Sequence, residues 1–230
     1  MLEAVLFDWG DTLARWEWSD ELHDAGHAAG FAAIGREASP ERTRRFRAEL
    51  LPLVEERDYR ELMREWLAPV ADEELERFLA AEYAAWQPGH HLAPTTPVLL
   101  ETLRDRGLKT GLVSNGFDPP DLVRAELSRL GVAQLLDVIV MSGDVGVRKP
   151  DPAIFRYALE RLGVEPEHAL MVGDSVPNDI AGAKALGMRT CQALWFVADV
   201  VEEPEPDFRA FSQMDVLIAV GRLQASVSTA

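Results

Sequence analysis

The sequence predicts an α/β protein, in which a Rossmann-like parallel sheet core is covered by helices and interrupted by an inserted α-helical bundle. After Pro94, short apolar runs alternate with helical patterns, as in a parallel sheet that is covered on both faces. One earlier apolar run, residues 5–7, ends at Asp8, as a buried strand with a carboxylate at its C-terminal end would. Between these regions, residues 15–89 have helical periodicity and few β-branched residues.

The domain boundaries follow from this alternation. Residues 1–14 and 92–230 are expected to form the α/β core and residues 15–91 a helical insert, a division that a chain of 230 residues accommodates. Prolines separate the helices expected in the insert, which are residues 20–36, 41–51, 58–67 and 72–86. In the core the expected order is helix 98–106, strand 109–114, helix 120–130, strand 135–141, helix 151–162, strand 168–173, helix 178–186 and strand 190–195, before a last strand and helix after Asp207.

The composition excludes several classes of protein. A net charge of −16 and a pI of about 4.7 give a surface that repels nucleic acid and anionic membranes, so neither is an expected partner. The one cysteine, Cys191, excludes an internal disulfide framework and a cysteine zinc cluster. No apolar stretch approaches the ~18 residues of a membrane span, and the first residues do not read as a signal peptide. We therefore expect a cytoplasmic protein.

Polar side chains follow four of the expected strands, at the edge where parallel sheets bind their ligands. In chain order they are Asp8, Trp9, Gly10, Asp11 and Thr12; Ser114, Asn115 and Gly116; Arg148 and Lys149; and Asp174, Ser175 and Asp179. Carboxylate oxygens are hard ligands that suit Mg²⁺. A lysine beside them would offset their mutual repulsion and bind an anion. The residues alone thus predict a magnesium and phosphate site.

These four groups resemble the four motifs of the haloacid dehalogenase-like hydrolase superfamily. That family has Asp-x-Asp-x-Thr after its first strand, a later strand that ends in Ser or Thr, a lysine before a helix, and Gly-Asp followed by a second acid. The corresponding segments here are residues 8–12, 111–116, 148–152 and 172–179. The resemblance extends over roughly residues 1–14 and 92–220.

The resemblance implies the chemistry of a phosphatase. Asp8 would attack phosphorus to form an aspartyl-phosphate, Ser114 would hold phosphoryl oxygens, and Lys149 would neutralise charge at Asp8 and the phosphate. The implied Mg²⁺ ligands are Asp8, the carbonyl of Gly10, Asp174 and, directly or through water, Asp179. Substrate contacts are expected from Trp9, Asp11, Thr12, Asn115 and Gly116. The helical insert would be the cap that selects the substrate, a small phosphorylated metabolite.

Gly10 departs from the family pattern, because the phosphatases carry there an Asp that protonates the leaving group and later activates water. General acid–base catalysis is worth ~10²–10⁴-fold, so three interpretations stay open. The first is a Mg²⁺-dependent phosphatase in which Asp11, His90 or His91 supplies the acid. The second is a metal-independent 2-haloacid dehalogenase, which also lacks this Asp and carries Ser-Asn-Gly in its second motif, although it has lost the acid that is Asp174 here. The third is a catalytically weak phospho-ligand binding or regulatory module.

The remaining features of the cap are interpreted as structural. A phosphonoacetaldehyde hydrolase is disfavoured because it needs a cap lysine, and residues 15–91 contain none. His23 and His27 lie four residues apart and are interpreted as surface residues rather than a metal pair. The tryptophans are interpreted as packing residues and the arginines as a solvated face with acidic partners. Hinges near residues 13–16 and 89–93 are expected to be mobile, and the chain is expected to be a monomer or a homodimer.

Overall fold

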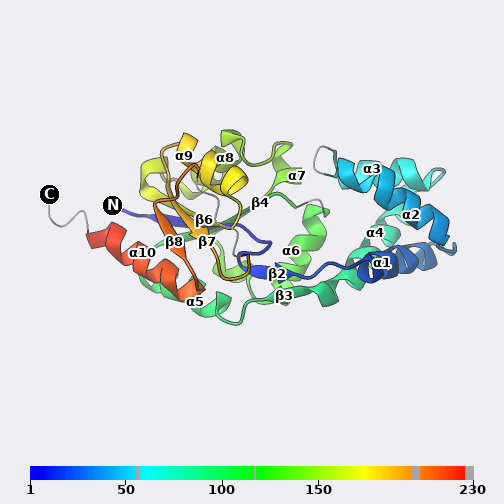
Figure 1. Ribbon diagram of the computed structural model, residues 1–230, viewed down its shortest axis with the longest axis horizontal. Coiled ribbons are helices and arrows are strands. Elements are labelled where there is room, and N and C mark those ends of the chain that lie inside the picture. Colours follow the sequence, from blue (N-terminus) through cyan, green and yellow to red (C-terminus); the bar gives the residue numbers. More distant parts are fainter. Residues whose placement is uncertain (55–56, 117, 198–202, 226–230) are drawn as a thin grey trace. The chain divides into compact units, whose positions relative to one another are not determined.

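The computed structural model describes residues 1–54, 57–116, 118–197 and 203–225 (Figure 1). The chain divides into two compact units, an α/β unit of residues 1–15, 92–115 and 126–230 and a helical unit of residues 16–91 and 116–125. The sequence prediction placed residues 116–125 in the core, whereas they group with the helical unit, in which Asp121 forms an ion pair of 3.2 Å with Arg60. The roles of the two units as catalytic core and cap stay predictions.

The α/β unit contains a six-stranded parallel sheet in the order β5-β4-β1-β6-β7-β8, which confirms the predicted fold class. The strands are β1 Ala4–Phe7, β4 Lys109–Ser114, β5 Val138–Met141, β6 Ala169–Gly173, β7 Arg189–Ala193 and β8 Phe208–Ala210. β1 lies at the centre, and all four of its residues are buried. Phe7 is in register with Leu112 on β4 and with Val172 on β6. The residues that follow β1, β4 and β6 therefore leave the sheet at the same edge.

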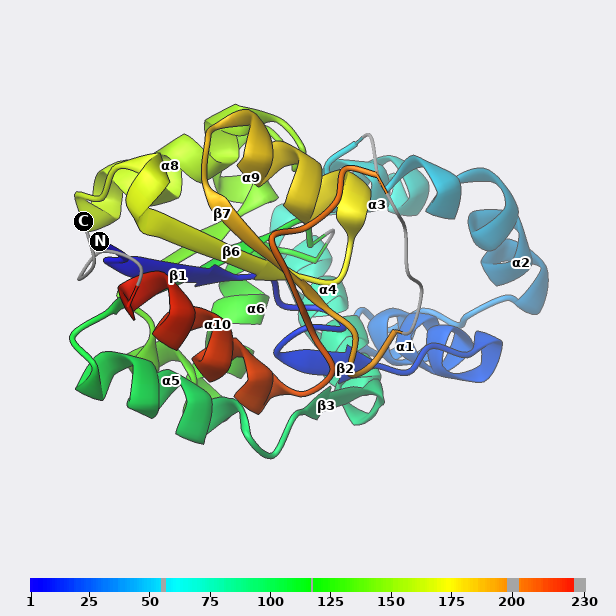
Figure 2. The same ribbon diagram turned by 60° about the vertical axis from the view of Figure 1, so that its left-hand side comes forward.

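Helices cover both faces of this sheet, as Figure 2 shows. One face carries α5 Thr96–Asp105 and α10 Gln213–Ala225, and the other carries α8 Pro152–Leu162 and α9 Ala181–Ala185. α8 buries Ile154, Phe155 and Leu159 in a cluster with residues of the strands. The short helix α7 Ser142–Val145 follows β5, and α6 Pro120–Arg129 spans the boundary of the two units. Within the described ranges, no helix is both long and apolar enough to cross a membrane.

Two core elements differ from the sequence prediction. β5 begins at Val138 because residues 133–135 form a 3₁₀ turn, and the carboxylate of Asp137 accepts a hydrogen bond of 2.8 Å from the backbone N–H of Thr110. The helix expected over residues 178–186 is a π-helical turn, Val176–Ile180, followed by α9. The apolar pattern predicted each element, but side-chain hydrogen bonds to the backbone moved its ends.

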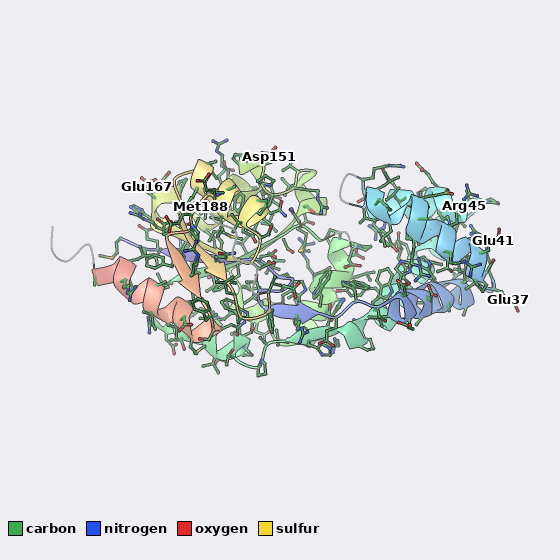
Figure 3. All side chains as sticks on the ribbon, viewed as in Figure 1. Glu37, Glu41, Arg45, Asp151, Glu167 and Met188 are labelled. Atoms are coloured by element: carbon green, nitrogen blue, oxygen red, sulfur yellow. The ribbon has the colours of Figure 1, made fainter. Side chains whose placement is uncertain are left out.

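The helical unit contains α1 Asp20–Ala33, α2 Pro40–Glu49, α3 Tyr59–Leu67 and α4 Asp72–Trp86. The side chains of Ser19, Ser39 and Asp58 cap the first three helices by accepting a backbone N–H of the first turn. Charged side chains of α2, among them Glu41 and Arg45, lie on the outside of this unit (Figure 3). Arg45 pairs with Glu49 at 2.8 Å, in agreement with the predicted solvated face.

α1 and α4 pack closely because glycines on α1 face aromatic rings on α4. A Cβ on Gly30 would lie 2.7 Å from the ring of Phe78, and one on Gly26 would lie 2.0 Å from Nε1 of Trp86. The buried stripe of α1 is His23, Gly26, His27, Gly30 and Phe31. This spacing of three and four residues puts both histidines on the packed face. The prediction that His23 and His27 lie on the surface is therefore wrong: they are 6% and 0% exposed.

A two-stranded ribbon that the sequence did not predict lies where the chain passes between the units. It pairs β2 Ala14–Trp16 with β3 His90–Leu92. Each strand has three residues, which is too short for a period-two pattern to be recognised. The unit boundary falls within both strands. The mobility expected of residues 13–16 and 89–93 stays a prediction.

The close approach of α1 and α4 generates a first prediction. Gly30→Ala should lower the free energy of unfolding by ~1–3 kcal/mol, because the new methyl group overlaps the buried ring of Phe78. Gly221→Ala is the matched control, since a Cβ there meets nothing within 4 Å in the middle of α10. That change should stabilise the protein by up to ~1 kcal/mol through helix propensity. Urea unfolding followed by circular dichroism measures both, and equal effects would contradict the packing argument.

Candidate active site

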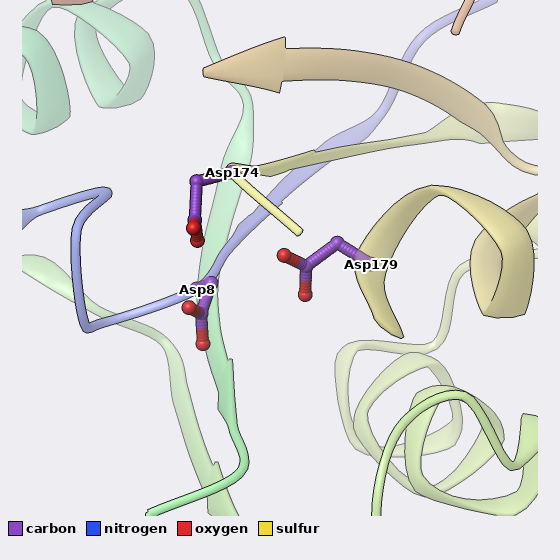
Figure 4. Close-up of side chains that lie close together, drawn as sticks. All are labelled: Asp8, Asp174 and Asp179. Atoms are coloured by element: carbon purple, nitrogen blue, oxygen red, sulfur yellow. The ribbon is translucent and has the colours of Figure 1, made fainter. Parts of the chain in front are cut away.

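Three carboxylates meet at the C-terminal edge of the sheet. Asp8 follows β1, Asp174 follows β6, and Asp179 lies in the π-helical turn after β6. Figure 4 shows the three side chains close together, and one oxygen from each lies within 4.8 Å of the others. The parallel register of β1 and β6 brings Asp8 and Asp174 together. The position of the third acid, Asp179, depends instead on how the turn after β6 is folded.

Gly173 lets Asp179 fold back toward the sheet. A Cβ at Gly173 would lie 2.2 Å from Oδ2 of Asp179, so only glycine leaves room for this carboxylate. The backbone N–H of Ser175 donates a hydrogen bond of 3.0 Å to the same Oδ2. The N–H of Asp179 donates to the carbonyl of Ser175 at 2.7 Å. These contacts explain chemically why Gly-Asp precedes a turn with a second acid.

Lys149 lies between two of the acids. Its Nζ is 2.6 Å from Oδ1 of Asp8 and 2.6 Å from Oδ1 of Asp179, and the residue is 4% exposed. Asn115 fixes the backbone at this point, since its Nδ2 donates to the carbonyl of Lys149 at 2.8 Å and its Oδ1 accepts from the N–H of Lys149 at 2.7 Å. Arg148 donates in turn to the carbonyl of Asn115 at 2.9 Å. Segments after β4 and β5 thereby hold the ammonium group in place.

The site carries more negative than positive charge. Burial alone would lower the pKa of Lys149, but Asp179 and Asp8 outweigh it and raise that pKa, so the ammonium stays charged. Burial, together with repulsion by Asp8 and Asp179, raises the pKa of Asp174 to about 7. Burial also raises the pKa of Asp179 to about 6, against the opposing attraction of Lys149. One lysine does not compensate three carboxylates, so a further cation would be favoured here.

The donor set fits a hard divalent cation. Asp8, Asp174 and Asp179 offer carboxylate oxygens, which Mg²⁺ and Ca²⁺ prefer over nitrogen or sulfur ligands. Burial is the main cause of the raised pKa of Asp174, and repulsion by the neighbouring carboxylates adds to it; a bound cation would relieve that repulsion. The residues that could hold such an ion are these three acids, with the backbone of Gly10 expected from the sequence beside them.

The loop after β1 is folded on its own backbone. The carbonyl of Trp9 accepts N–H groups of Leu13 and Ala14, both at 3.0 Å, and Asp11 has a φ of 50°. Aspartate tolerates this left-handed conformation better than most side chains do. Thr12 is fully buried, and its hydroxyl lies 3.5 Å from Oδ1 of Asp174. The loop after β1 therefore contacts Asp174, the acid after β6, through Thr12.

Residues distant in sequence hold the same loop. The carbonyl of Thr12 accepts from Nε1 of Trp195 at 2.9 Å and from Nε2 of Gln213 at 3.2 Å. Gln213 also donates to the hydroxyl of Thr96 at 2.8 Å, and that hydroxyl donates to the carbonyl of Leu13 at 2.9 Å. The sequence analysis missed Trp195 and Gln213, because no local pattern links either residue to the loop.

The structure brings together only some of the residues that the sequence proposed. Ser114 ends β4 and is buried, and Trp9 is 1% exposed, so its ring packs inside the protein. The side chain of Asn115 is occupied by the backbone of Lys149. Gly116 belongs to the helical unit. The substrate contacts expected of Trp9, Asn115 and Gly116 stay predictions. In the structure, the Asn115 side chain holds the backbone of Lys149 in position.

The histidines considered as substitute acids belong to the helical unit. His90 stacks on Trp16 with ring centroids 4.8 Å apart and an angle of 12° between the planes. His91 is exposed and lies 3.5 Å from Glu17. Asp11 is the one of the three candidates that lies in the α/β unit, and its charge contributes to the raised pKa of Asp174.

Comparison with known proteins identifies relatives of the chain. The sequence profile of the haloacid dehalogenase-like hydrolases matches residues 2–187. A phosphoserine phosphatase of Thermus thermophilus is 38% identical over 146 residues, which are 62% of this chain and 57% of that protein. The chain thus matches little more than half the length of this relative.

Two solved structures resemble the whole chain. A HAD phosphatase from Thermococcus onnurineus has a TM-score of 0.70 and 29% identity, with 96% of this chain and 98% of that chain covered. A 2-haloacid dehalogenase from Pseudomonas syringae pv. Tomato DC3000 also has a TM-score of 0.70, with 25% identity over 97% and 100% of the two chains. Fold similarity therefore does not separate the two chemistries.

The surplus of negative charge generates a second prediction. With a pKa of about 7 in the folded protein and about 4 in the unfolded chain, Asp174 ionises first in the unfolded chain. The fold without a cation therefore loses stability as the pH rises from about 4 to 7. In EDTA, Asp174→Asn should be more stable than the wild type by ~1–2 kcal/mol at pH 8, after allowance for solvent screening, and by little at pH 5.

Added Mg²⁺ should reverse this order. At ten times its dissociation constant it should stabilise the wild type by ~1.4 kcal/mol, and it should stabilise Asp174→Asn by much less. Thermal unfolding at pH 5 and pH 8 measures both effects. Asp105→Asn, at an exposed position in the same unit, should behave as the wild type. A wild type that is more stable than Asp174→Asn in EDTA at pH 8 would contradict the electrostatic argument.

Proposed function

Because the chain belongs to the haloacid dehalogenase-like hydrolase family, we propose that it is a Mg²⁺-dependent phosphatase of a small phosphorylated metabolite. The observation that carries the proposal is the cluster of Asp8, Asp174 and Asp179 around one buried lysine. A metal-free hydrolase would have no use for a third crowded carboxylate that repels the other two. The phosphoserine phosphatase and the HAD phosphatase among the similar proteins also support it.

Asp8 is the proposed nucleophile. One of its carboxylate oxygens attacks phosphorus, the bond from phosphorus to the ester oxygen breaks, and the leaving alcohol takes a proton. Water then hydrolyses the aspartyl-phosphate, which releases phosphate and restores Asp8. A buried strand end supports this role, because β1 holds the carboxylate rigidly at the edge of the sheet.

Charge compensation is the proposed task of the surrounding groups. Lys149 contacts Oδ1 of Asp8, so it screens the repulsion between that carboxylate and an approaching phosphate. Ser114, at the end of the neighbouring strand, is the proposed donor to phosphoryl oxygens. A Mg²⁺ ion on Asp8, Asp174, Asp179 and the carbonyl of Gly10 would neutralise phosphoryl oxygens when bound. These groups would act by positioning the phosphate and stabilising its charge, as phosphoryl transfer requires.

Asp11 is the proposed source of the proton that Gly10 does not supply. Asp11 lies in the loop after β1, and its charge is close enough to Asp174 to raise the pKa of that acid. Proximity to the carboxylate cluster supports this role, because a general acid must lie within hydrogen-bond reach of the leaving group. His90 is a poorer candidate because its ring is stacked on Trp16.

A metal-independent 2-haloacid dehalogenase is the second candidate. The observations that favour it are Gly10, the sequence Ser114-Asn115-Gly116, and the similarity to the Pseudomonas dehalogenase. In this reaction Asp8 would attack the carbon that bears the halogen and expel halide. The presence of Asp174 in a carboxylate cluster favours the phosphatase. Halide release from 2-chloropropionate in EDTA is the discriminating measurement.

The main prediction concerns p-nitrophenyl phosphate. The wild type should release phosphate with Mg²⁺ and not in EDTA, and Asp8→Asn should lose more than ~10³-fold in kcat because it removes the nucleophile. Asp105→Asn is the matched control and should retain full turnover. The good leaving group of this substrate needs no general acid, so a failure cannot be blamed on Gly10.

Other outcomes of this experiment would point to a different function or mechanism. If the protein releases no phosphate but releases halide without a metal, it is a 2-haloacid dehalogenase and not a phosphatase. Neither release, with saturable binding of inorganic phosphate, would leave a phospho-ligand binding module. Phosphate release that persists in Asp8→Asn would remove Asp8 from the nucleophilic role.

The role of Asp11 has a test of its own. Asp11→Asn should slow hydrolysis of an alkyl phosphate such as glycerol 3-phosphate by ~10²-fold or more, while p-nitrophenyl phosphate is affected much less. Gly10→Asp in the Asp11→Asn background should restore part of the lost rate, since it places an acid where the phosphatases of the family carry one. Equal losses on both substrates would show that Asp11 acts on binding or on the fold of the loop rather than on the proton.

A further inference from the structure

The helical unit contains a cavity that is separate from the carboxylate cluster. Its volume is about 310 Å³, at the lower end of the range of small-molecule sites. It lies among the start of α1, the end of α2 and the end of α4, and its lining includes Trp18, Asp20, His23, Arg47, Leu51 and Trp86. All of these residues belong to one unit, so the cavity needs no contribution from the α/β unit.

His23 is a buried hydrogen-bonding group with no partner. It lines the cavity and is 6% exposed, and neither ring nitrogen forms a hydrogen bond within the part of the chain that the structure describes. The carboxylate nearest to Nδ1, that of Asp24, is 3.9 Å away. Leaving such a group unpaired costs free energy. A ligand with a hydroxyl or a ring N–H would satisfy it.

The cation at the cavity is already compensated. Arg47 forms ion pairs with Asp20 at 2.9 Å and with Asp24 at 3.5 Å. An anionic ligand would therefore have to displace a carboxylate that Arg47 holds. Since the whole chain has a net charge of −16, a phosphorylated or otherwise anionic compound finds no unpaired positive charge here.

The groups of the polar wall behind His23 are shifted toward their neutral forms. Burial, with a contribution from Arg47, lowers the pKa of His23. The neighbouring His27 ring has its centroid 4.3 Å away, and burial lowers its pKa to about 3. His27 Nε2 lies 3.2 Å from Glu82, whose pKa burial raises, and Glu82 accepts a hydrogen bond of 2.8 Å from Tyr59. Neutral imidazole offers one donor and one acceptor to a ligand.

The other walls suit a flat ring. The indole rings of Trp18 and Trp86 meet edge to face, with centroids 5.3 Å apart and planes at 75°. Leu51 adds an aliphatic wall. Aromatic pairs prefer such edge-to-face or offset contacts, so a planar ring gains both burial and ring–ring contact in this cavity.

We propose that the cavity at the start of α1 binds a small, uncharged aromatic compound with a hydroxyl or ring N–H group, of the phenol or indole type, which hydrogen-bonds to His23. This site lies outside the catalytic carboxylates and does not depend on the proposed phosphatase activity. The compound would occupy the helical unit, which the family resemblance gives the role of a cap.

The test is binding of phenol and of indole to the full chain, measured by ligand-observed NMR or calorimetry, with toluene as a ligand of similar size without a polar group. Phenol should bind at least threefold more tightly than toluene. His23→Leu should weaken phenol by roughly three- to tenfold, the value of one hydrogen bond, and leave toluene unchanged or improved. Leu51→Trp should fill the cavity and weaken both phenol and indole by more than tenfold.

His91→Leu is the matched control, since His91 is an exposed histidine of the same unit that does not line the cavity. It should bind all three compounds as the wild type does. If Leu51→Trp fails to fold, as judged by circular dichroism, the comparison of phenol with toluene in wild type and His23→Leu decides alone. No saturable binding of phenol or indole at millimolar concentration would overturn the proposal, as would phenol binding that His23→Leu leaves unchanged.

Discussion

The buried ammonium of Lys149 makes the arrangement at the edge of the sheet possible. Two carboxylates, Asp8 and Asp179, lie at 2.6 Å from one nitrogen in a region nearly closed to water. Without that charge, burial would drive Asp179 further toward protonation. Asn115 fixes the lysine through its backbone. Lys149 therefore compensates the charge of a carboxylate at the end of the central strand, the position from which Asp8 is proposed to act as a nucleophile.

Asp174 marks the limit of this compensation. Burial, together with repulsion by Asp8 and Asp179 that the lysine does not balance, raises the pKa of Asp174 to about 7. The fold accepts this strain at a site whose oxygen donors fit a divalent cation. Hydrogen bonds from Trp195 and Gln213 to the carbonyl of Thr12 hold the neighbouring loop.

The helical unit also contains a buried titratable pair, His27 and Glu82, which lie 3.2 Å apart. Burial lowers the pKa of His27 to about 3 and raises the pKa of Glu82, so it shifts each group toward its neutral form. Glycines on α1 let the rings of α4 approach closely, which leaves little room for water around these groups. In the α/β unit, the buried carboxylates of Asp8 and Asp179 instead contact the charged ammonium group of Lys149.

The sequence by itself determined the parallel sheet, the insert after the first strand, and the strand ends that carry Asp8, Ser114 and Asp174, because period, apolar runs and chain order are local signals. It also identified Lys149 and Asp179, first as polar residues after expected strands and then through the family resemblance. Tertiary structure alone decided that Asn115 holds Lys149 in place, that Trp195 and Gln213 hold the loop of Thr12, and that His23 and His27 are buried. These facts depend on contacts between residues far apart in the chain, or on which helix face meets a neighbour, and no local pattern records either.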